Sequence, residues 1–112
     1  MRIGQPELRE KDIQRQVMDY LRVRHIPAME THGMHHIPGG GMRIIRPFKK
    51  GTPDIVGCLP WNGRMFQIEI KDADGRVSPE QRDVMAEYKG AGALVLVARS
   101  VEDVVAALDK AR

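Results

Sequence analysis

The sequence predicts a mixed α/β fold in which helices pack on a β-sheet, with the element order αβββαβα. Residues 7–24 repeat apolar side chains at helical spacing. Residues 54–71 contain two short β-prone runs joined by an Asn-Gly turn. A continuous apolar run at 93–98 lies between two segments that begin with helix caps. A strand of that kind is typical of a sheet covered by helices on both faces.

Size and composition favour one domain spanning residues 1–112. The chain is 42% hydrophobic and 29% charged, which is ordinary for a globular protein. No apolar run approaches the roughly 20 residues of a membrane span, and the N-terminus has no apolar signal-peptide region. Cys58 is the single cysteine, so no internal disulfide can form. We therefore expect a cytoplasmic setting and no membrane contact.

The first half of the chain predicts a helix, a short strand and a long loop. After Leu8, the apolar residues Ile13, Val17 and Leu21 form one helical stripe within residues 7–24. A short strand is expected at 27–32. Residues 33–51 are rich in Gly and Pro and lack a period, which predicts a loop with a brief strand at 43–45. Loops of this length are often functional.

The middle of the chain predicts a β-hairpin. Strands are expected at 54–59 and 64–71, with residues 60–63 (PWNG) as the turn. If the pairing is centred on Asn-Gly, residue numbers summing to about 125 face each other. Asp54 would then lie opposite Lys71 and one pleat from Glu69.

The last part predicts a helix, a strand and a helix. Residues 72–75 (DADG) form a turn, and Ser78 caps a helix that runs to about residue 89, with Pro at its first position and Gln81 at its third. The apolar strand 93–98 follows. Ser100 caps a final helix over 101–111.

The predicted hairpin places an acid and a base together. Side chains alternate across a strand, so Gln67, Glu69 and Lys71 share a face that must meet either solvent or a polar cleft. A solvated strand face is the simpler interpretation of that pattern alone. Asp54, at the open end of the same hairpin, brings a second carboxylate to this point, and the joint arrangement is harder to explain as surface polarity.

Two carboxylates and a lysine are suited to phosphodiester hydrolysis. Hard oxygen ligands select Mg²⁺, with Mn²⁺ able to replace it. The carbonyl of Ile70 is expected beside the carboxylates of Asp54 and Glu69. A lysine next to a metal-bound water can orient it, and its charge favours the pentavalent phosphate.

These residues resemble the PD-(D/E)XK nuclease signature. The matching residues are Gly51-Thr-Pro-Asp54, followed after 14 residues by Glu69-Ile-Lys71. The continuation to Ser78-Pro-Glu-Gln81 is similar to the VRR-NUC branch of that superfamily, in which a glycine turn leads to a helix opening Ser-x-x-Gln. The resemblance spans about residues 7–105. It implies a restriction-endonuclease-like core of the stand-alone, virus-type kind, a homodimer, and the host cytoplasm if the protein is viral.

The resemblance also implies a role for each matching residue. Asp54, Glu69 and the Ile70 carbonyl would hold the metal, and Lys71 would handle the attacking water. Gln81 would reach the active site or DNA from its helix. The family also uses an acid on the first helix, for which we choose Glu10, with Gln14 on the same face as a DNA-contacting residue. Glu7 is the competing choice. Asp72 follows Lys71 where the family more often has a small residue, and is either a solvated turn residue or a charge that weakens the local positive field.

Charge and resemblance together point to DNA. Between residues 31 and 53 there is no acid. Four basic residues fall there and are expected to contact phosphate: Arg43, Arg46, Lys49 and Lys50. We therefore predict a Mg²⁺-dependent, structure-selective DNA endonuclease acting on branched DNA such as Holliday junctions.

Three other interpretations remain. The chain could be a non-catalytic nucleic-acid-binding protein that retains the nuclease fold, or a structural protein whose charged strand face is merely solvated. A zinc site is a weaker hypothesis, because its candidate ligands have no standard spacing. Those candidates are His32, His35, His36 and Cys58.

Overall fold

The computed structural model describes residues 8–36, 39–45 and 48–112, and of residues 33–36 and 42–45 it describes the backbone. Three helices and six strands follow one another within these ranges. They are α1 (Glu10–Val23), β1 (Ala28–Glu30), β2 (Gly33–His36), β3 (Met42–Ile45), β4 (Ile55–Cys58), β5 (Met65–Ile70), α2 (Pro79–Gly90), β6 (Leu94–Ala98) and α3 (Val101–Lys110).

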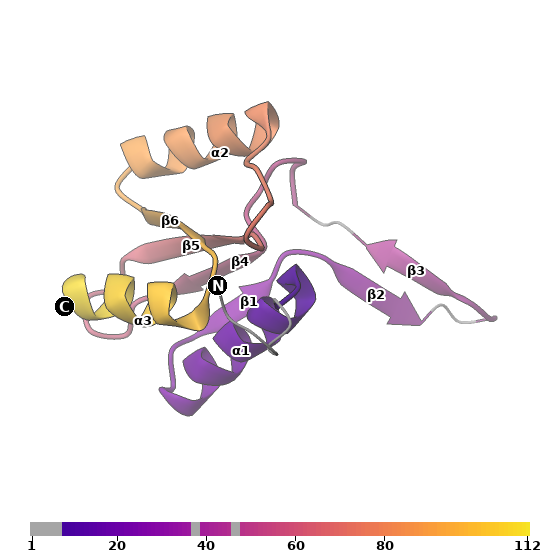
Figure 1. Cartoon of the computed structure of the whole chain (residues 1–112), viewed down its shortest axis with the longest axis horizontal. Coiled ribbons are helices and arrows are strands. Elements are labelled where there is room, and N and C mark those ends of the chain that lie inside the picture. Colours follow the sequence, from indigo (N-terminus) through magenta and orange to yellow (C-terminus); the bar gives the residue numbers. More distant parts are fainter. Residues whose placement is uncertain (1–7, 37–38, 46–47) are drawn as a thin grey trace, which may run out of the picture.

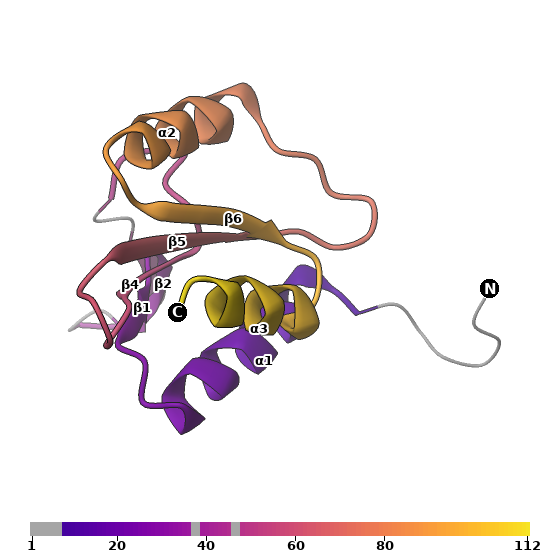
Figure 2. The ribbon, with the colours of Figure 1, turned by 90° about the vertical axis from the view of Figure 1, so that its left-hand side faces the viewer.

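Four strands form the main sheet in the order β1-β4-β5-β6. β1 and β5 both pair antiparallel with β4, whereas β6 pairs parallel with β5. A parallel neighbour needs a crossover connection, and α2 supplies it. Figures 1 and 2 show α2 on one face of the sheet and α1 with α3 on the other. The predicted α/β fold is confirmed. In the described part of the chain, no helix is long and apolar enough to cross a membrane.

The apolar core fills the space between the sheet and the pair α1 and α3. Phe66, Ile68 and Ile70 alternate along β5 toward this side, and each is fully buried. The stripe predicted on the first helix meets them, together with residues of the last helix. Those helical core residues are Ile13, Val17, Leu21, Val104 and Leu108.

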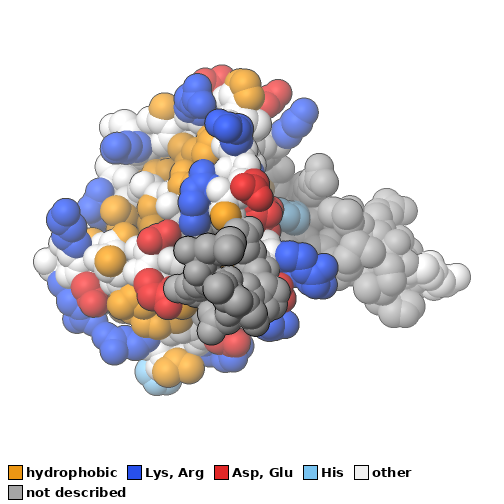
Figure 3. All heavy atoms as spheres, viewed as in Figure 1, with side chains coloured by type: hydrophobic (Ala, Val, Ile, Leu, Met, Phe, Trp, Pro, Cys, Tyr) orange, Lys and Arg blue, Asp and Glu red, His pale blue; other side chains and the backbone are white. Residues whose placement is uncertain are grey.

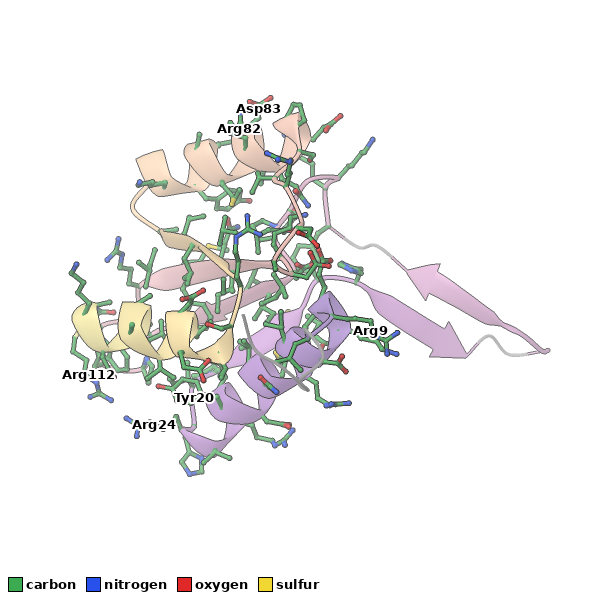
Figure 4. All side chains as sticks on the ribbon, in the orientation of Figure 1. Arg9, Tyr20, Arg24, Arg82, Asp83 and Arg112 are labelled. Atoms are coloured by element: carbon green, nitrogen blue, oxygen red, sulfur yellow. The ribbon has the colours of Figure 1, made fainter. Side chains whose placement is uncertain are left out.

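The opposite face of β5 is buried too, but it is polar. Gln67 and Glu69 are only 1% and 2% exposed. α2 covers this side while burying a single apolar side chain, Val84, and its exposed residues include Arg82 and Asp83 (Figure 4). Of the two surroundings predicted for the Gln67–Glu69 face, the structure has the polar cleft.

A second, two-stranded sheet made of β2 and β3 projects from the body (Figure 1). Its antiparallel register pairs Gly33 with Ile45. The brief strand expected at 43–45 is confirmed as part of β3, whereas β2 was not predicted. Gly39, Gly40 and Gly41 lie between the strands and all have positive φ angles.

The register of the β4–β5 hairpin differs from the prediction by two residues. Ile55 pairs with Ile68 and Cys58 with Met65, so the predicted pairing of Asp54 with Lys71 is wrong. The ladder closes at the Leu59 N–H, which donates to the Arg64 carbonyl. The connection is therefore the four-residue loop 60–63 rather than a two-residue Asn-Gly turn. The shift brings Asp54 level with Glu69 and Ile70.

Candidate active site

Asp54 is fixed by backbone contacts at the start of β4. Its Oδ2 accepts a 2.8 Å hydrogen bond from the Ile70 N–H of the neighbouring strand. The turn before it packs against the first turn of α2, because a Cβ on Gly51 would lie 2.7 Å from the Glu80 carbonyl oxygen. Gly51 also has a φ of +91°, which L side chains rarely adopt. Glycine at this position therefore sets the distance between Asp54 and α2.

Glu69 lies at the centre of the site. Its Oε2 accepts a 2.8 Å hydrogen bond from Gln81 Nε2 and lies 3.2 Å from Lys71 Nζ. Its Oε1 is buried and has no hydrogen-bond partner among the described residues. A buried carboxylate oxygen without a donor costs free energy, so this atom is available to a ligand that supplies positive charge.

Gln81 is oriented by the helix cap that the sequence predicted. Ser78 Oγ accepts from the Gln81 N–H, and Gln81 Oε1 accepts from the Ser78 N–H at 2.9 Å. This capping box occupies the amide oxygen of Gln81. The amide nitrogen therefore faces Glu69, and the Ser-x-x-Gln stretch both starts α2 and holds the carboxylate.

The site carries more negative charge than its lysine neutralises. The pKa of Glu69 is raised to about 7, chiefly by burial and next by the nearby Asp54 carboxylate. The hydrogen bond and charge of Lys71 oppose this rise, while Glu10 adds to it. Three carboxylates around one ammonium leave room for a cation.

Glu10 and Lys71 meet at the turn after β5. A Cβ on Gly75 would lie 3.0 Å from Glu10 Oε1 and 3.1 Å from Lys71 Cδ. Asp72 shapes this turn, because its Oδ1 accepts from the N–H groups of Asp74 and Gly75. The structure therefore supports the turn-residue interpretation of Asp72. Glu7, the alternative to Glu10, lies outside the described residues.

Arg99, directly after β6, is hydrogen-bonded to the same turn at residues 72–75. Its Nη1 donates to the carbonyl of Asp72 at 2.5 Å and to that of Gly75 at 2.8 Å. The turn connects Lys71 to α2, so Arg99 restrains the path between them.

The site opens into a cleft of about 300 Å³. Its walls come from α1, the end of β1, the segment before β4, the end of β5 and the start of α2. The lining residues are Glu10, Thr31, His32, Phe48, Lys49, Lys50, Gly51, Thr52, Asp54, Glu69, Lys71, Ser78, Glu80 and Gln81. In Figure 3, acidic and basic side chains gather on the body beside the projecting hairpin.

The predicted DNA-contacting residues divide into three groups. Lys49 and Lys50 line the cleft. Gln14 lies on α1 but is not in the cleft wall. Arg46 and the side chain of Arg43 lie outside the described residues.

Thr31 and His32 are cleft residues that the sequence did not connect with Asp54. They lie more than 20 residues before it in the chain, and the pairing of β1 with β4 brings the two segments together. Cys58 is at the other end of β4, where its N–H donates to the Pro27 carbonyl. The zinc hypothesis that joined His32 to Cys58 is therefore wrong for that pair. Within the described ranges, no three His, Cys, Asp or Glu side chains form a metal-binding group by themselves.

Residues 41–102, more than half of the chain, match the family model of the VRR-NUC domain. The chain belongs to the VRR-NUC family. Comparison with curated proteins gave no match. Two solved structures share the fold, one described as a VRR_NUC domain protein and one as a VRR_NUC domain.

Both VRR-NUC structures are 20% identical to this chain and superpose with a TM-score of 0.61. The first alignment covers 93% of this chain and 88% of the other, and the second covers 90% of each. The predicted family and the nuclease-type fold are thereby confirmed. The family match includes Asp54, Glu69, Lys71 and Gln81, whereas Glu10 lies outside the matched residues.

Proposed function

We propose that this protein is a metal-dependent, structure-selective DNA endonuclease that hydrolyses phosphodiester bonds, with branched DNA such as Holliday junctions as its substrate. The observation that carries the proposal is the buried Glu69 carboxylate, which has one oxygen unpartnered and lies beside Asp54 and Lys71 in an open cleft. A protein that only bound DNA would gain nothing from acids facing phosphate.

The donor set fits a hard divalent cation. Asp54 and Glu69 would hold Mg²⁺, with Mn²⁺ as a substitute, together with the Ile70 carbonyl. The Ile70 N–H donates to Asp54. Because the N–H and C=O of a strand residue point to the same edge of the strand, the Ile70 carbonyl also faces the edge on which Asp54 lies. A bound cation would lower the pKa of its water and offset the charge that develops on phosphate.

The chain's own residues would position the reactants. The Lys71 side chain is only 12% exposed, and its ammonium, 3.2 Å from Glu69 Oε2, would orient the attacking water and face the developing negative charge. Gln81 holds Glu69 in place, and Glu10 lies against the turn that carries Lys71. Each side chain is held by hydrogen bonds or packing, so little rearrangement would be needed.

DNA would approach along the basic side of the cleft. Lys49 and Lys50 are exposed there, and we propose that they bind phosphates with Arg43, Arg46 and Gln14. Cutting two strands symmetrically requires two active sites, so a twofold homodimer suits a junction substrate.

Cleavage of labelled four-way junction, flap, duplex and single-stranded DNA tests the proposal, in Mg²⁺, Mn²⁺ or EDTA. Wild type should cut only with metal, and Lys71→Met should lose at least about a hundredfold in rate. Lys89→Met, at the far end of α2, is the matched control and should cut normally. If wild type binds DNA but never cuts, and Lys71→Met binds equally well, the protein is a nucleic-acid-binding protein that retains the fold.

A further inference from the structure

His32 is held against Asp54 by its neighbour Thr31. The Thr31 N–H donates to the Asp54 carbonyl at 2.9 Å, and Thr31 Oγ1 donates to the Pro53 carbonyl at 2.8 Å. Thr31 is buried, so these bonds lock the end of β1 onto the segment that carries Asp54. The imidazole of His32 therefore lies in the cleft wall as part of the fold, although its side chain is 43% exposed.

The hydrogen bonds of Thr31 favour one tautomer of His32. The single hydroxyl hydrogen of Thr31 is used by the Pro53 carbonyl. Thr31 Oγ1 lies 3.4 Å from His32 Nδ1 and can only accept there, which favours the tautomer with the hydrogen on Nδ1. In the neutral ring the other nitrogen, Nε2, then presents a lone pair.

That lone pair faces a carboxylate oxygen. His32 Nε2 lies 3.8 Å from Asp54 Oδ1, while Asp54 Oδ2 already accepts from the Ile70 N–H. The separation is too long for a hydrogen bond. Two metal bonds of about 2.1 Å each span up to about 4.2 Å, so one cation can contact both atoms.

We infer that His32 Nε2 is a further ligand of the divalent cation held by Asp54. The inference rests on the proposed function and deepens it. Metal-binding histidines usually donate their second ring N–H to a fixed oxygen, and Thr31 Oγ1 provides that oxygen. No three described His, Cys, Asp or Glu side chains are already grouped as a metal site, so the remaining ligands would come from Glu69 Oε1 in the same cleft, from water or from substrate phosphate.

An imidazole ligand changes which ion the site prefers. Oxygen-only sites suit Mg²⁺, whereas a nitrogen ligand strengthens binding of Mn²⁺ and Co²⁺ over Mg²⁺. His32 thus gives this chain a preference for transition ions that Asp54, Glu69 and the Ile70 carbonyl would not confer.

Pulsed electron paramagnetic resonance of the DNA-free protein loaded with Mn²⁺ tests the ligand directly, because it detects a coordinated ¹⁴N nucleus. Wild type should show ¹⁴N coupling, and His32→Ala should lose it. His25→Asn is the matched control, since His25 is exposed at the end of α1 and its φ of +56° suits Asn. That variant should keep the coupling.

Calorimetric titration with Mn²⁺ and Mg²⁺ provides a second measurement. His32→Ala should weaken Mn²⁺ binding by about tenfold or more and Mg²⁺ binding by much less. Mn²⁺ bound to wild type without ¹⁴N coupling would overturn the His32 inference and leave the proposed function standing. Coupling that survives in His32→Ala would also overturn it. No binding of either ion would overturn both.

Discussion

The two faces of β5 are equally buried and chemically opposite. Toward α1 and α3, Phe66, Ile68 and Ile70 pack in an apolar core. Toward α2, Gln67 and Glu69 are just as inaccessible, yet each keeps one oxygen without a partner. The first face stabilises the fold by removing apolar area from water. The second carries the cost of buried polarity, and at Glu69, which lines the cleft, a bound ligand would offset that cost.

The largest effect on stability is expected for a substitution in the apolar face of β5. The Phe66 ring fills the space above Gly57, where an added Cβ would lie 2.3 Å from its Cζ. Phe66→Ala should lower the free energy of unfolding by about 3–5 kcal/mol, because it leaves a cavity in a packed core. Chemical denaturation measures this loss.

Glu69→Gln is the matching change on the polar face, and we expect it to affect cleavage rather than stability. Its size is nearly unchanged and Gln81 can still donate to it, so stability at pH 8 should not fall, while metal-dependent cleavage should be lost. If Glu69→Gln destabilised the protein as much as Phe66→Ala, both faces would be structural and the contrast would be wrong.

A smaller effect is expected where α2 meets the turn before Asp54. Gly51→Ala combines an unfavourable positive φ with a 2.7 Å clash against the Glu80 carbonyl. It should cost about 2–4 kcal/mol and reduce cleavage by moving Asp54 away from α2.

Gly92→Ala separates the effect of a positive φ from the effect of a steric clash. Gly92 has a φ of +106°, but no atom lies within 4 Å of an added Cβ. This variant should cost only about 1–2 kcal/mol in thermal or chemical unfolding and leave cleavage intact. Equal losses in both variants would mean that the close approach to α2 does not matter.

The polar face should also make the stability of the metal-free protein depend on pH. The pKa of Glu69 rises from 4.5 to about 7 on folding, so the folded state binds more protons than the unfolded state between these values. Stability is then lost as pH rises from about 4.5 to about 7, by an amount on the order of 3 kcal/mol.

Unfolding in EDTA across this pH range measures the effect as the difference between wild type and Glu69→Gln, which removes the contribution of other carboxylates. Wild type should lose stability relative to the variant as pH rises. A constant difference would show that Glu69 ionises as freely in the folded protein as in the unfolded one.

Local sequence determined most of the elements. The apolar stripe of α1, the Ser78 cap of α2 and the apolar run of β6 each depend on residues close in the chain, so their periods and caps could be interpreted without a structure. The motif residues Asp54, Glu69 and Lys71 were equally visible. The strand β2 was missed because Gly- and Pro-rich sequence has no period.

Tertiary structure alone decided how the elements meet. The β4–β5 register, shifted by two residues, depends on the geometry of the loop at 60–63 and sets Asp54 level with Glu69. The burial of Glu69 depends on α2 crossing that face, and the approach of His32 to Asp54 depends on pairing between β1 and β4. These contacts join residues distant in sequence, so no local pattern encodes them. They determine which of the described oxygens lack partners, and therefore where the proposed cation would bind.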